Sequence, residues 1–391
     1  MTVWGPTVSH GLSRFQEWKH SPNEQGQMSP HRLERLTEVR DLDPPARDRR
    51  PWIRWTEVRV EPAATNAARR WVRPPWNVPD QWTVQPFETA SLGSDLRRVF
   101  AVGKRVLWLR YQKGAWLRPF APHSGYGPGR PVWVVDLGEG CPMDCTYCVL
   151  QSYLQHPYQV VYVNLDDLDR ALAAFRPEEP VVLAAGVYVD SGVILRVLDV
   201  WPVLLPWLEH HPAHLLELRT KLAVPDEWLP KRPPANLVFG VSLTPSPWDR
   251  LWEIWTDPVE VRLAWLGEVA RAGFRVALHF DPLIGAPGWQ SAYADLIAAL
   301  AGVVPRRAVA FISMGSLRFD TALKAIARAR FATRAFWTGP FVRAPDGLYR
   351  YAWPIRRRMY IWMREQLQRA FPGVAVFYAM EPFAHVLTGE I

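Results

Sequence analysis

The sequence predicts an α/β fold in which a parallel sheet forms a partial (β/α)6 barrel of the TIM type. Three observations support this prediction. From about residue 130, short apolar segments typical of buried strands alternate with segments of helical periodicity. About six such units follow one another, fewer than the eight of a complete barrel. Before residue 85 the composition is rich in proline, arginine and tryptophan, which indicates a separate N-terminal extension.

The predicted elements of the barrel follow in order along the chain. Buried strands are expected at 131–137, 180–189, 214–222, 236–245, 274–284 and 306–317. Helices are expected at 163–175, 191–211, 257–273, 288–304 and 320–330. Asn164 occupies the N-cap position of the first of these helices. Because the chemistry of such folds lies at the C-terminal ends of the strands, the loop after 131–137 is the first place to expect a site.

These patterns divide the chain into four parts. Residues 1–85 are predicted as an extended N-terminal arm and 86–130 as a lead-in segment. Residues 131–330 are predicted as the barrel. Residues 331–391 are expected to form a basic hairpin, a long C-terminal helix and a last strand.

The N-terminal arm is basic and aromatic. Between Arg47 and Arg73 it holds eight arginines against three acids, together with Trp52, Trp55 and Trp71. Arginine interleaved with aromatic side chains is typical of segments that bind nucleic-acid backbone and bases. The alternative is that these tryptophans pack against the protein itself.

Composition and charge indicate which partners and which cellular compartment to expect. The net charge of +8 favours acidic partners, nucleic acid first. The start of the chain lacks the pattern of a secretory signal, and no apolar run reaches the roughly 18 residues of a spanning helix, so we expect a cytoplasmic protein with no membrane span. We also expect a monomer. The chain has three cysteines, too close together for a disulfide framework, which indicates free thiols in a reducing compartment.

The three cysteines, Cys141, Cys145 and Cys148, form the pattern C-x3-C-x2-C. Three thiolates on one loop, with no fourth thiol in the chain, leave one coordination position open. Zinc with a histidine as fourth ligand is one interpretation, and His156 is the nearest candidate. Structural zinc sites usually have two separated pairs of ligands, so a 4Fe–4S cluster with one open iron fits this single loop better.

This pattern, with Tyr147 directly before the last cysteine, resembles the signature of the radical S-adenosylmethionine (SAM) superfamily. The resemblance implies that the three thiolates hold three irons of a 4Fe–4S cluster, that SAM chelates the fourth iron, and that Tyr147 packs near the adenine. An electron from an external flavodoxin- or ferredoxin-like donor then cleaves SAM to methionine and a 5′-deoxyadenosyl radical, which abstracts hydrogen from the substrate.

A wider resemblance, to the spore photoproduct lyase family, extends from Val132 to the C-terminus. It rests on four segments in their order and spacing, "GCPMDCTYCVLQSYLQHPYQVVYVNLDDL", "LELRTKL", "LVFGVSLTP" and "GWQSAYADLIAAL". It implies that Lys221 pairs with the carboxylate or ribose of SAM and that Ser242 makes a polar contact with it. The alternative for Lys221 is an ordinary lysine at a strand end.

The resemblance also implies a reaction, which is the repair of a thymine dimer formed by ultraviolet light in spore DNA. In the family, a further cysteine returns a hydrogen to the thymine radical. Gly186 is nearest to that position here, and Val149 replaces a tyrosine that follows the cluster motif. We therefore consider Tyr188 as the hydrogen donor. The alternative is that Tyr188 is a buried strand tyrosine.

The C-terminal part is expected to bind DNA. Residues 331–360 carry six arginines and one acid among many aromatics, and "RAPDGLYR" is typical of a hairpin with Asp346-Gly347 at its turn. The resemblance implies that this hairpin opens duplex DNA and that Tyr349 fills the gap of a flipped base. The arginines expected to contact phosphates are Arg343, Arg350, Arg356, Arg357 and Arg358. The alternative is a solvated basic helix start.

Three functions follow from these patterns. The favoured one is a radical SAM lyase that reverses the spore photoproduct in DNA. The second is a radical SAM enzyme with a peptide or small metabolite as substrate, for which a basic hairpin would not be needed. The third is a module without catalytic activity, in which a metal is a structural clip and the arginines bind nucleic acid.

Overall fold

The computed structural model describes residues 55–89, 95–120, 129–332, 337–384 and 387. The chain divides into two units, Met1–Arg50 and Pro51–Ile391, and every described residue belongs to the second. The described part contains two larger sheets, a three-stranded sheet and a two-stranded pairing.

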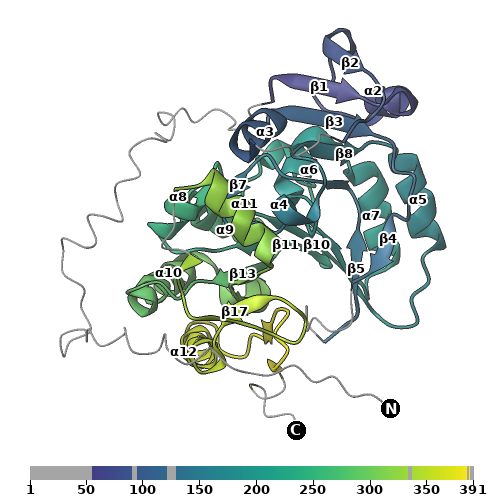
Figure 1. Cartoon of the computed structure of the whole chain (residues 1–391). Coiled ribbons are helices and arrows are strands. Elements are labelled where there is room, and N and C mark those ends of the chain that lie inside the picture. The colour runs from purple at the N-terminus through teal and green to yellow at the C-terminus, as the bar shows by residue number, and fades with distance from the viewer. Residues whose placement is uncertain (1–54, 90–94, 121–128, 333–336, 385–386, 388–391) are drawn as a thin grey trace, which may run out of the picture. The chain divides into compact units, whose positions relative to one another are not determined.

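The larger sheet has eight strands in the order β18-β14-β13-β11-β10-β9-β5-β4 (Figure 1). Six neighbouring parallel strands form its centre, namely β5 (Val132–Val135), β9 (Val182–Ala185), β10 (Leu215–Thr220), β11 (Leu237–Ser242), β13 (Arg275–Leu283) and β14 (Val309–Ser316). Strand β18 (Val376–Tyr378) continues the sheet in parallel, and β4 (Leu117–Pro119) ends it antiparallel to β5. Because β18 and β4 are edges that do not pair with each other, the barrel is open, which confirms the predicted partial barrel.

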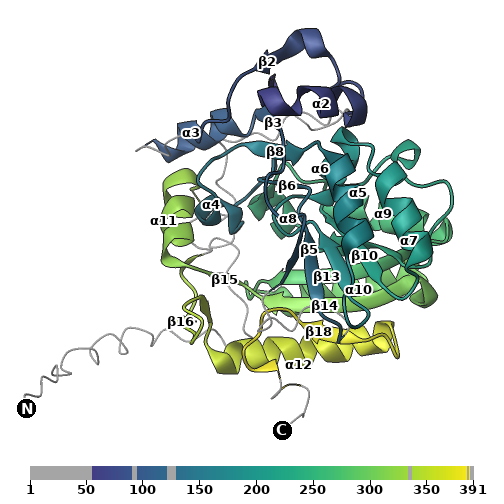
Figure 2. The same cartoon turned by 90° about the vertical axis from the view of Figure 1, so that its right-hand side faces the viewer.

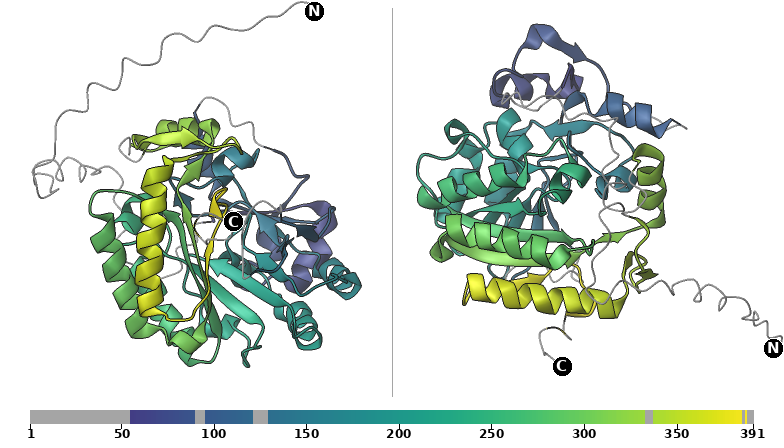
Figure 3. Two further views of the ribbon diagram at one scale, coloured as in Figure 1. Left: turned by 90° about the horizontal axis from the view of Figure 1, so that it is seen from below. Right: turned by 90° about the vertical axis from the view of Figure 1, so that its left-hand side faces the viewer.

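Helices cover one face of this curved sheet (Figure 3). They are α5 (Leu165–Ala174), α6 (Ser191–Val197), α7 (Trp201–His210), α9 (Val259–Arg271), α10 (Trp289–Val303) and α12 (Trp353–Ala370), with shorter pieces α8 (Trp248–Trp252), η3 (Asp226–Trp228) and η4 (Arg306–Ala308). Their apolar sides and one face of the strands form the main hydrophobic core. Asn164 lies at the N-cap of α5 as predicted, but its Oδ1 accepts from the backbone of Gln112, 2.7 Å away, instead of capping the helix.

Side chains on the opposite face of the strands are less apolar. Successive strand residues point to opposite faces, so every second residue faces away from the helices. Two small clusters lie there, around Val182 on β9 and around Ala277 on β13. Beyond them, toward the C-terminal ends of the strands, the same face carries Glu217, His279 and Ser313, all buried. The lumen of the open barrel is therefore polar toward the C-terminal ends of the strands and apolar toward their N-terminal ends.

The second sheet has five strands in the order β2-β1-β3-β8-β6 (Figure 2). Its parallel strands are β2 (Trp82–Val84), β1 (Glu57–Val60), β3 (Val106–Arg110) and β8 (Gln159–Tyr162), and β6 (Gly138–Glu139) is antiparallel to β8. The connecting helices are η1 (Pro62–Ala64), α2 (Thr65–Trp71), η2 (Pro79–Gln81) and α3 (Leu96–Gly103).

This second sheet corrects the prediction of an extended arm for residues 57–84, while residues 1–54 lie outside the described part of the chain. From Glu57 onward the segment is folded, and β1 lies between β2 and β3. Trp55 and Trp71 are each only 7% exposed, so these two tryptophans pack against the protein itself. Trp52 lies outside the described residues. Strand β1 was missed because its four residues are held by strands that come much later in the chain, which no local pattern reveals.

The C-terminal hairpin is formed as predicted. Strands β16 (Phe341–Arg343) and β17 (Tyr349–Tyr351) pair antiparallel, and β15 (Arg318–Phe319) adds a third strand. Gly347 at the turn has φ of 85°, a conformation that favours glycine. None of the described helices has the length and apolar character needed to cross a membrane.

Candidate active site

The three cysteines lie on one loop, directly after β6. A Cβ atom at Gly140 would collide with the carbonyl oxygen of Tyr158 on the segment leading into β8, and φ of Gly140 is 81°. Only glycine allows both this backbone conformation and this close approach. The loop therefore starts pressed against the second sheet, and Cys141 follows at once.

The middle of the loop is held by backbone pairing. Strand β7 (Asp144–Cys145) is antiparallel to β12 (Glu253–Ile254), and the N–H of Thr146 donates to the carbonyl of Trp252 at 2.8 Å. After Cys148 the chain enters the short helix α4 (Leu150–Tyr153). Gln151 of this helix donates from its side chain to the carbonyl of Cys145 at 2.9 Å.

Two buried, positively charged side chains bind the cysteine loop and hold it in place. Lys104, directly after α3, donates from Nζ to the carbonyls of Cys141 and Met143 at 2.8 and 2.6 Å. At the end of α11 (Thr321–Arg330), Nη2 of Arg330 lies 2.8 Å from both carboxylate oxygens of Asp144, and Nη1 donates to the side-chain oxygen of Gln151. Such charge-assisted hydrogen bonds are stronger than neutral ones. Residues from α3, α4 and α11 thus determine where the thiols lie.

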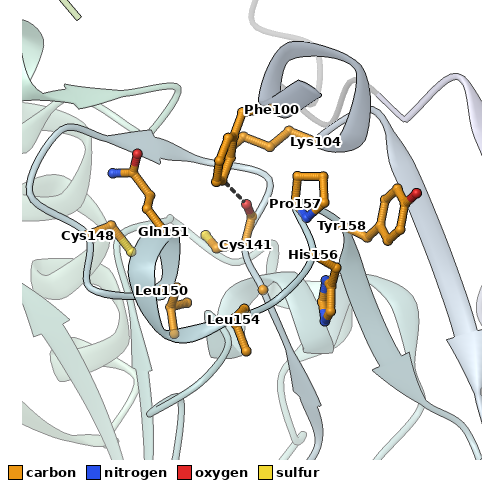
Figure 4. A pocket seen from close by; sticks show the side chains of 11 residues that line it. Phe100, Lys104, Cys141, Cys148, Leu150, Gln151, Leu154, His156, Pro157 and Tyr158 are labelled. Atoms are coloured by element: carbon orange, nitrogen blue, oxygen red, sulfur yellow. Dashed lines mark hydrogen bonds between the residues drawn. The ribbon is translucent and has the colours of Figure 1, made fainter. Parts of the chain in front are cut away.

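The side chains of Cys141 and Cys148 line the same pocket (Figure 4). Cys145, between them in the loop, is buried. The pocket is also lined by Phe100, Lys104, Leu150, Gln151, Leu154, His156, Pro157 and Tyr158. Burial raises the pKa of the Cys141 and Cys145 thiols. Thiolates at such depth need positive charge beside them, and the irons of a bound cluster would provide it.

The described residues fit a cluster better than a single ion. No three side chains of the metal-binding types in this part of the chain come close enough to share one ion. His156, the candidate zinc ligand, instead lies with Nε2 3.1 Å from Glu139, and its ring stacks on Tyr158. In a 4Fe–4S cluster each thiolate takes its own iron, so the three thiols of this loop need not converge on one point.

The predicted SAM-binding residues converge on a carboxylate that sequence reasoning missed. Glu253, fully buried on β12, accepts from the hydroxyl of Tyr147 and lies 3.8 Å from Nζ of Lys221. Lys221 also lies over the Tyr147 ring, 5.8 Å from its centre. Arg262 of α9 binds Glu253 at 2.5 Å and donates to the carbonyl of Ser242 at 2.8 Å. Tyr147, Lys221 and Ser242 therefore belong to one buried network.

Charge balance within this network keeps its ionisable groups charged. Burial alone raises the pKa of Glu253, but the charges of Arg262 and Lys221 and the hydrogen bond from Tyr147 bring it below the ordinary value. Burial likewise opposes the charge on Lys221, and Glu253 outweighs it, so the pKa of Lys221 is raised. Lys221, which is partly exposed, therefore keeps a positive charge beside the cysteine loop, where an anionic group of a ligand would be stabilised.

Tyr188 lies on the loop after β9, not within a strand as the predicted range 180–189 had it. The strand ends at Ala185, and Tyr188 is half-buried. Its ring stacks on that of Tyr153 of α4, with centres 5.3 Å apart and planes 12° apart. The guanidinium of Arg118 lies 5.3 Å from the Tyr188 ring centre. Burial and the hydrogen bond with Tyr153 raise the pKa of Tyr188, so its phenol keeps its proton.

The backbone is tightly packed at Gly186, the residue that the sequence places nearest to the expected hydrogen-donor position. At Gly186 φ is 127°, and an added Cβ would lie 2.8 Å from the carbonyl oxygen of Arg219 and from Oγ of Ser191. Asp190 caps α6 and also binds the Thr220 hydroxyl, 2.7 Å away. A larger residue at Gly186 would require the loop to shift.

The polar layer of the lumen was also missed. His279 lies between Glu217, 2.5 Å from its Nε2, and Ser313, 2.6 Å from its Nδ1. Burial raises the pKa of Glu217 to about 8, and it lowers that of His279 well below its ordinary value. Arg219 binds Glu217 at 3.2 Å from the rim of the lumen. One signal was present in the sequence, because Glu217, Arg219 and Lys221 alternate along a strand that is otherwise apolar.

The five predicted DNA-binding arginines divide into two groups. Arg343, Arg357 and Arg358 are exposed. Arg350, 1% exposed, forms a forked ion pair with Asp346, and Arg356, 2% exposed, binds Glu381. A buried guanidinium that is already paired holds the fold together.

The structure therefore narrows the candidate phosphate contacts to the three exposed arginines. Tyr349, the candidate base-gap residue, is half-buried, and its ring stacks on Phe319 at 5.7 Å.

Known structures share this fold. A spore photoproduct lyase in which one cysteine is changed to alanine, with dinucleoside spore photoproduct, matches with a TM-score of 0.70 and 21% identity, over 83% of this chain and 98% of that one. A spore photoproduct lyase complexed with the same dinucleoside matches with a TM-score of 0.69 and 20% identity, over 84% and 99%. A double variant with bound AdoMet and the dinucleoside gives 0.68 and 20%, over 83% and 98%.

Sequence comparison carries the assignment. No curated protein matches this chain. The sequence profile of the family described as spore photoproduct lyase matches residues 128–336, which is more than half of the chain and includes the cysteine loop and most of the barrel. The chain therefore belongs to the spore photoproduct lyase family and is a radical SAM lyase.

Proposed function

We propose that this protein reverses a thymine-dimer lesion in DNA by radical SAM chemistry, with Cys141, Cys145 and Cys148 as ligands of a 4Fe–4S cluster. When bound, the cluster and SAM supply a 5′-deoxyadenosyl radical that abstracts hydrogen from the lesion. The observation that carries the proposal is a single loop that holds all three thiols, two of them facing one pocket, beside a buried Tyr147–Glu253–Lys221 network, in a chain of this family.

Several residues of the chain would contribute to the binding of SAM in different ways. Lys221, whose side chain is 17% exposed, would meet the carboxylate or ribose of SAM, and the fully buried Glu253 would hold Lys221 in place. Arg262 holds Glu253 in place and fixes the end of β11 through the carbonyl of Ser242, which leaves the Ser242 side chain as a polar contact. Tyr147 is fixed by its hydrogen bond to Glu253 and limits the space near the adenine.

DNA as the substrate is supported by the family and by the relatives that bind dinucleoside spore photoproduct. The exposed Arg343, Arg357 and Arg358 supply positive charge at the hairpin and at the start of α12. Phosphate contacts of this kind position a duplex without reading its sequence. Tyr349, beside the exposed Arg343 on the hairpin, is placed to occupy the space of an extruded base.

Hydrogen return is assigned to Tyr188, because the chain has no cysteine outside the cluster loop. Its protonated phenol gives a hydrogen atom to the thymine radical: a C–H bond forms, the O–H bond breaks, and a tyrosyl radical remains. One electron from the protein's reductant and one proton then restore the tyrosine. Tyr188→Phe should abolish repaired thymine while 5′-deoxyadenosine still forms, whereas normal repair by this variant would exclude the role.

A radical SAM reaction on another substrate is the second candidate. One observation favours it, which is that Gly186 leaves no room for a cysteine at the site of the family's hydrogen donor. A substrate radical that is quenched in another way, or that rearranges, would not need such a donor.

One anaerobic experiment separates these candidates. The reconstituted protein is given dithionite, SAM and an oligonucleotide containing spore photoproduct, and 5′-deoxyadenosine and thymine are followed by mass spectrometry. Both products together support lesion reversal. Deoxyadenosine without repaired thymine supports the second candidate, and no deoxyadenosine at all contradicts radical SAM chemistry on these cysteines.

A further inference from the structure

We infer that the surface formed by helices α3, α4 and α11 is the docking site of a small acidic protein that delivers one electron to the cluster. We call this the α3–α4–α11 surface and define it by Arg97, Arg98, Val149, Lys324 and Arg328. The inference rests on the proposed function, since only a cluster at the cysteine loop gives the electron a destination.

The three helices form one continuous surface. Helix α11 packs against both α3 and α4, and the three lie next to one another in Figure 2. Arg97 of α3 donates from Nε to the carbonyl of Arg330 at the end of α11, 3.3 Å away. Ser152 of α4 bonds to Asp320 at the start of α11 at 3.1 Å. A partner that docks on one helix therefore meets the others.

This surface is directly connected to the cysteine loop. Phe100 and Lys104 from the end of α3 and Gln151 from α4 line the same pocket as Cys141 and Cys148 (Figure 4). From α11, the Arg330 side chain reaches Asp144 within the loop. The inner sides of α3 and α4 therefore line the pocket that Cys141 and Cys148 face. Because electron transfer weakens steeply with distance, the face nearest the cysteines is where a donor must dock.

The chemistry of the surface fits an acidic protein partner. Arg97, Arg98 and Arg328 are exposed and Lys324 is half-buried. The acids among these helices, Asp95 and Asp320, accept from the backbone N–H groups of Arg98 and Leu323 and so serve as helix caps. The net charge of the surface is therefore positive, and it attracts an acidic carrier over distance.

An exposed apolar side chain accompanies these charges. Val149, next to Cys148, is 52% exposed. An apolar centre with a charged rim is typical of protein–protein contacts, in which the charges steer the approach and the apolar contact seats the partner. Duplex DNA, the competing acidic partner, would gain little from the exposed valine beside the cysteine.

The test compares two ways of reducing the same protein. We would change Arg98 and Arg328 to Glu together and measure 5′-deoxyadenosine formation with a reduced acidic flavodoxin and, separately, with dithionite. The flavodoxin-driven rate should fall by about tenfold or more at low salt, since steering by charge commonly changes association rates by at least this much. The dithionite-driven rate should stay at the wild-type value, because this small reductant needs no docking surface.

A matched control is available. Lys231→Glu with Arg232→Glu makes the same change in net charge on exposed residues of the segment that enters β11, at the opposite ends of the strands. This control should keep the flavodoxin-driven rate. An equal loss in the control, or a full rate in R98E/R328E, would overturn the docking site. So would a loss of affinity for duplex DNA with an unchanged flavodoxin rate, because it would assign the surface to DNA.

The outcome remains informative if the charge-reversed protein misfolds. In that case both rates fall, and Arg98→Gln with Arg328→Gln takes its place. The wild-type protein gives a second readout, since its flavodoxin-driven rate should drop between 50 and 200 mM salt while its dithionite-driven rate does not. Absence of deoxyadenosine with dithionite in the wild type would instead contradict the proposed function itself.

Discussion

Two neighbouring residues in the lumen of the barrel, Glu217 and His279, bind and release protons as a coupled pair. Glu217 and His279 lie 2.5 Å apart and are almost fully buried, with Ser313 and Arg219 as their other polar partners. The raised pKa of Glu217 and the lowered pKa of His279 mean that the folded pair holds one proton over a wide pH range. Which of the two atoms carries the proton does not change that count.

The pair predicts a definite dependence of stability on pH. In the unfolded chain the two groups have pKa values near 4.5 and 6.5. Below about pH 4.5 the unfolded state therefore binds one proton more than the folded pair, and stability falls with falling pH. Between about 6.5 and 8 the folded pair binds one more, and stability falls as pH rises.

Glu217→Gln should change this profile in a recognisable way. The neutral amide leaves only His279, whose folded pKa is depressed, so the acid loss should begin near pH 6.5 and the loss between 6.5 and 8 should disappear. Urea unfolding of both proteins from pH 4 to 9 measures this. Parallel profiles for the two proteins would show that the pair does not titrate as a unit.

At the scale of elements, the cysteine loop depends on close contact with the second sheet. The contact is made at Gly140, where an added methyl group would collide with the backbone of Tyr158 and the positive φ would be strained. Because the obstacle is backbone, a side chain cannot simply move aside. The loop and the strand after it must separate, and Cys141 moves with them.

Gly140→Ala should therefore destabilise the protein by about 1–3 kcal/mol and reduce the iron bound after reconstitution. Gly302→Ala is the control, since no atom lies within 4 Å of an added Cβ there and the residue is inside α10. That change should be neutral or stabilise by up to about 1 kcal/mol. Chemical denaturation and iron content measure both, and equal behaviour of the two variants would contradict the close-contact argument.

Across the whole protein, two exposed, positively charged surfaces each have a different proposed partner. The exposed arginines of the hairpin and α12 are assigned to DNA, and those of α3 and α11 to an electron donor. Arg350 and Arg356 serve neither, because their guanidiniums are buried against Asp346 and Glu381. Net charge alone could not make this division.

Arg357→Glu with Arg358→Glu should weaken binding to duplex DNA and make it less sensitive to salt, because each lost phosphate contact removes one released counterion. For the wild type, affinity should fall steeply between 50 and 200 mM salt. Fluorescence anisotropy with a labelled duplex measures both. A wild-type affinity that does not change with salt would exclude phosphate contacts as the source of binding.

Local sequence patterns were enough to predict the barrel and the loop that holds the three cysteines. The six central strands and their helices follow from apolar periodicity, which is a local signal, and the cysteine spacing is complete within eight residues. The hairpin followed from its Asp-Gly turn. These features could be predicted because the residues that specify each of them are neighbours in the chain.

The residues that surround the thiols could not be predicted from the sequence, because they come from distant segments that only the tertiary structure brings together. Lys104, Glu253 and Arg330 come from segments before and after the motif, and nothing in their local sequence marks them as neighbours of the cysteines. The same holds for β1, which folds only because strands from later in the chain pair with it. Tyr188 lies outside the strand that was predicted to contain it, because β9 ends at Ala185. Contacts between distant segments, and the burial they produce, decide which charged side chains support the fold and which remain available for function.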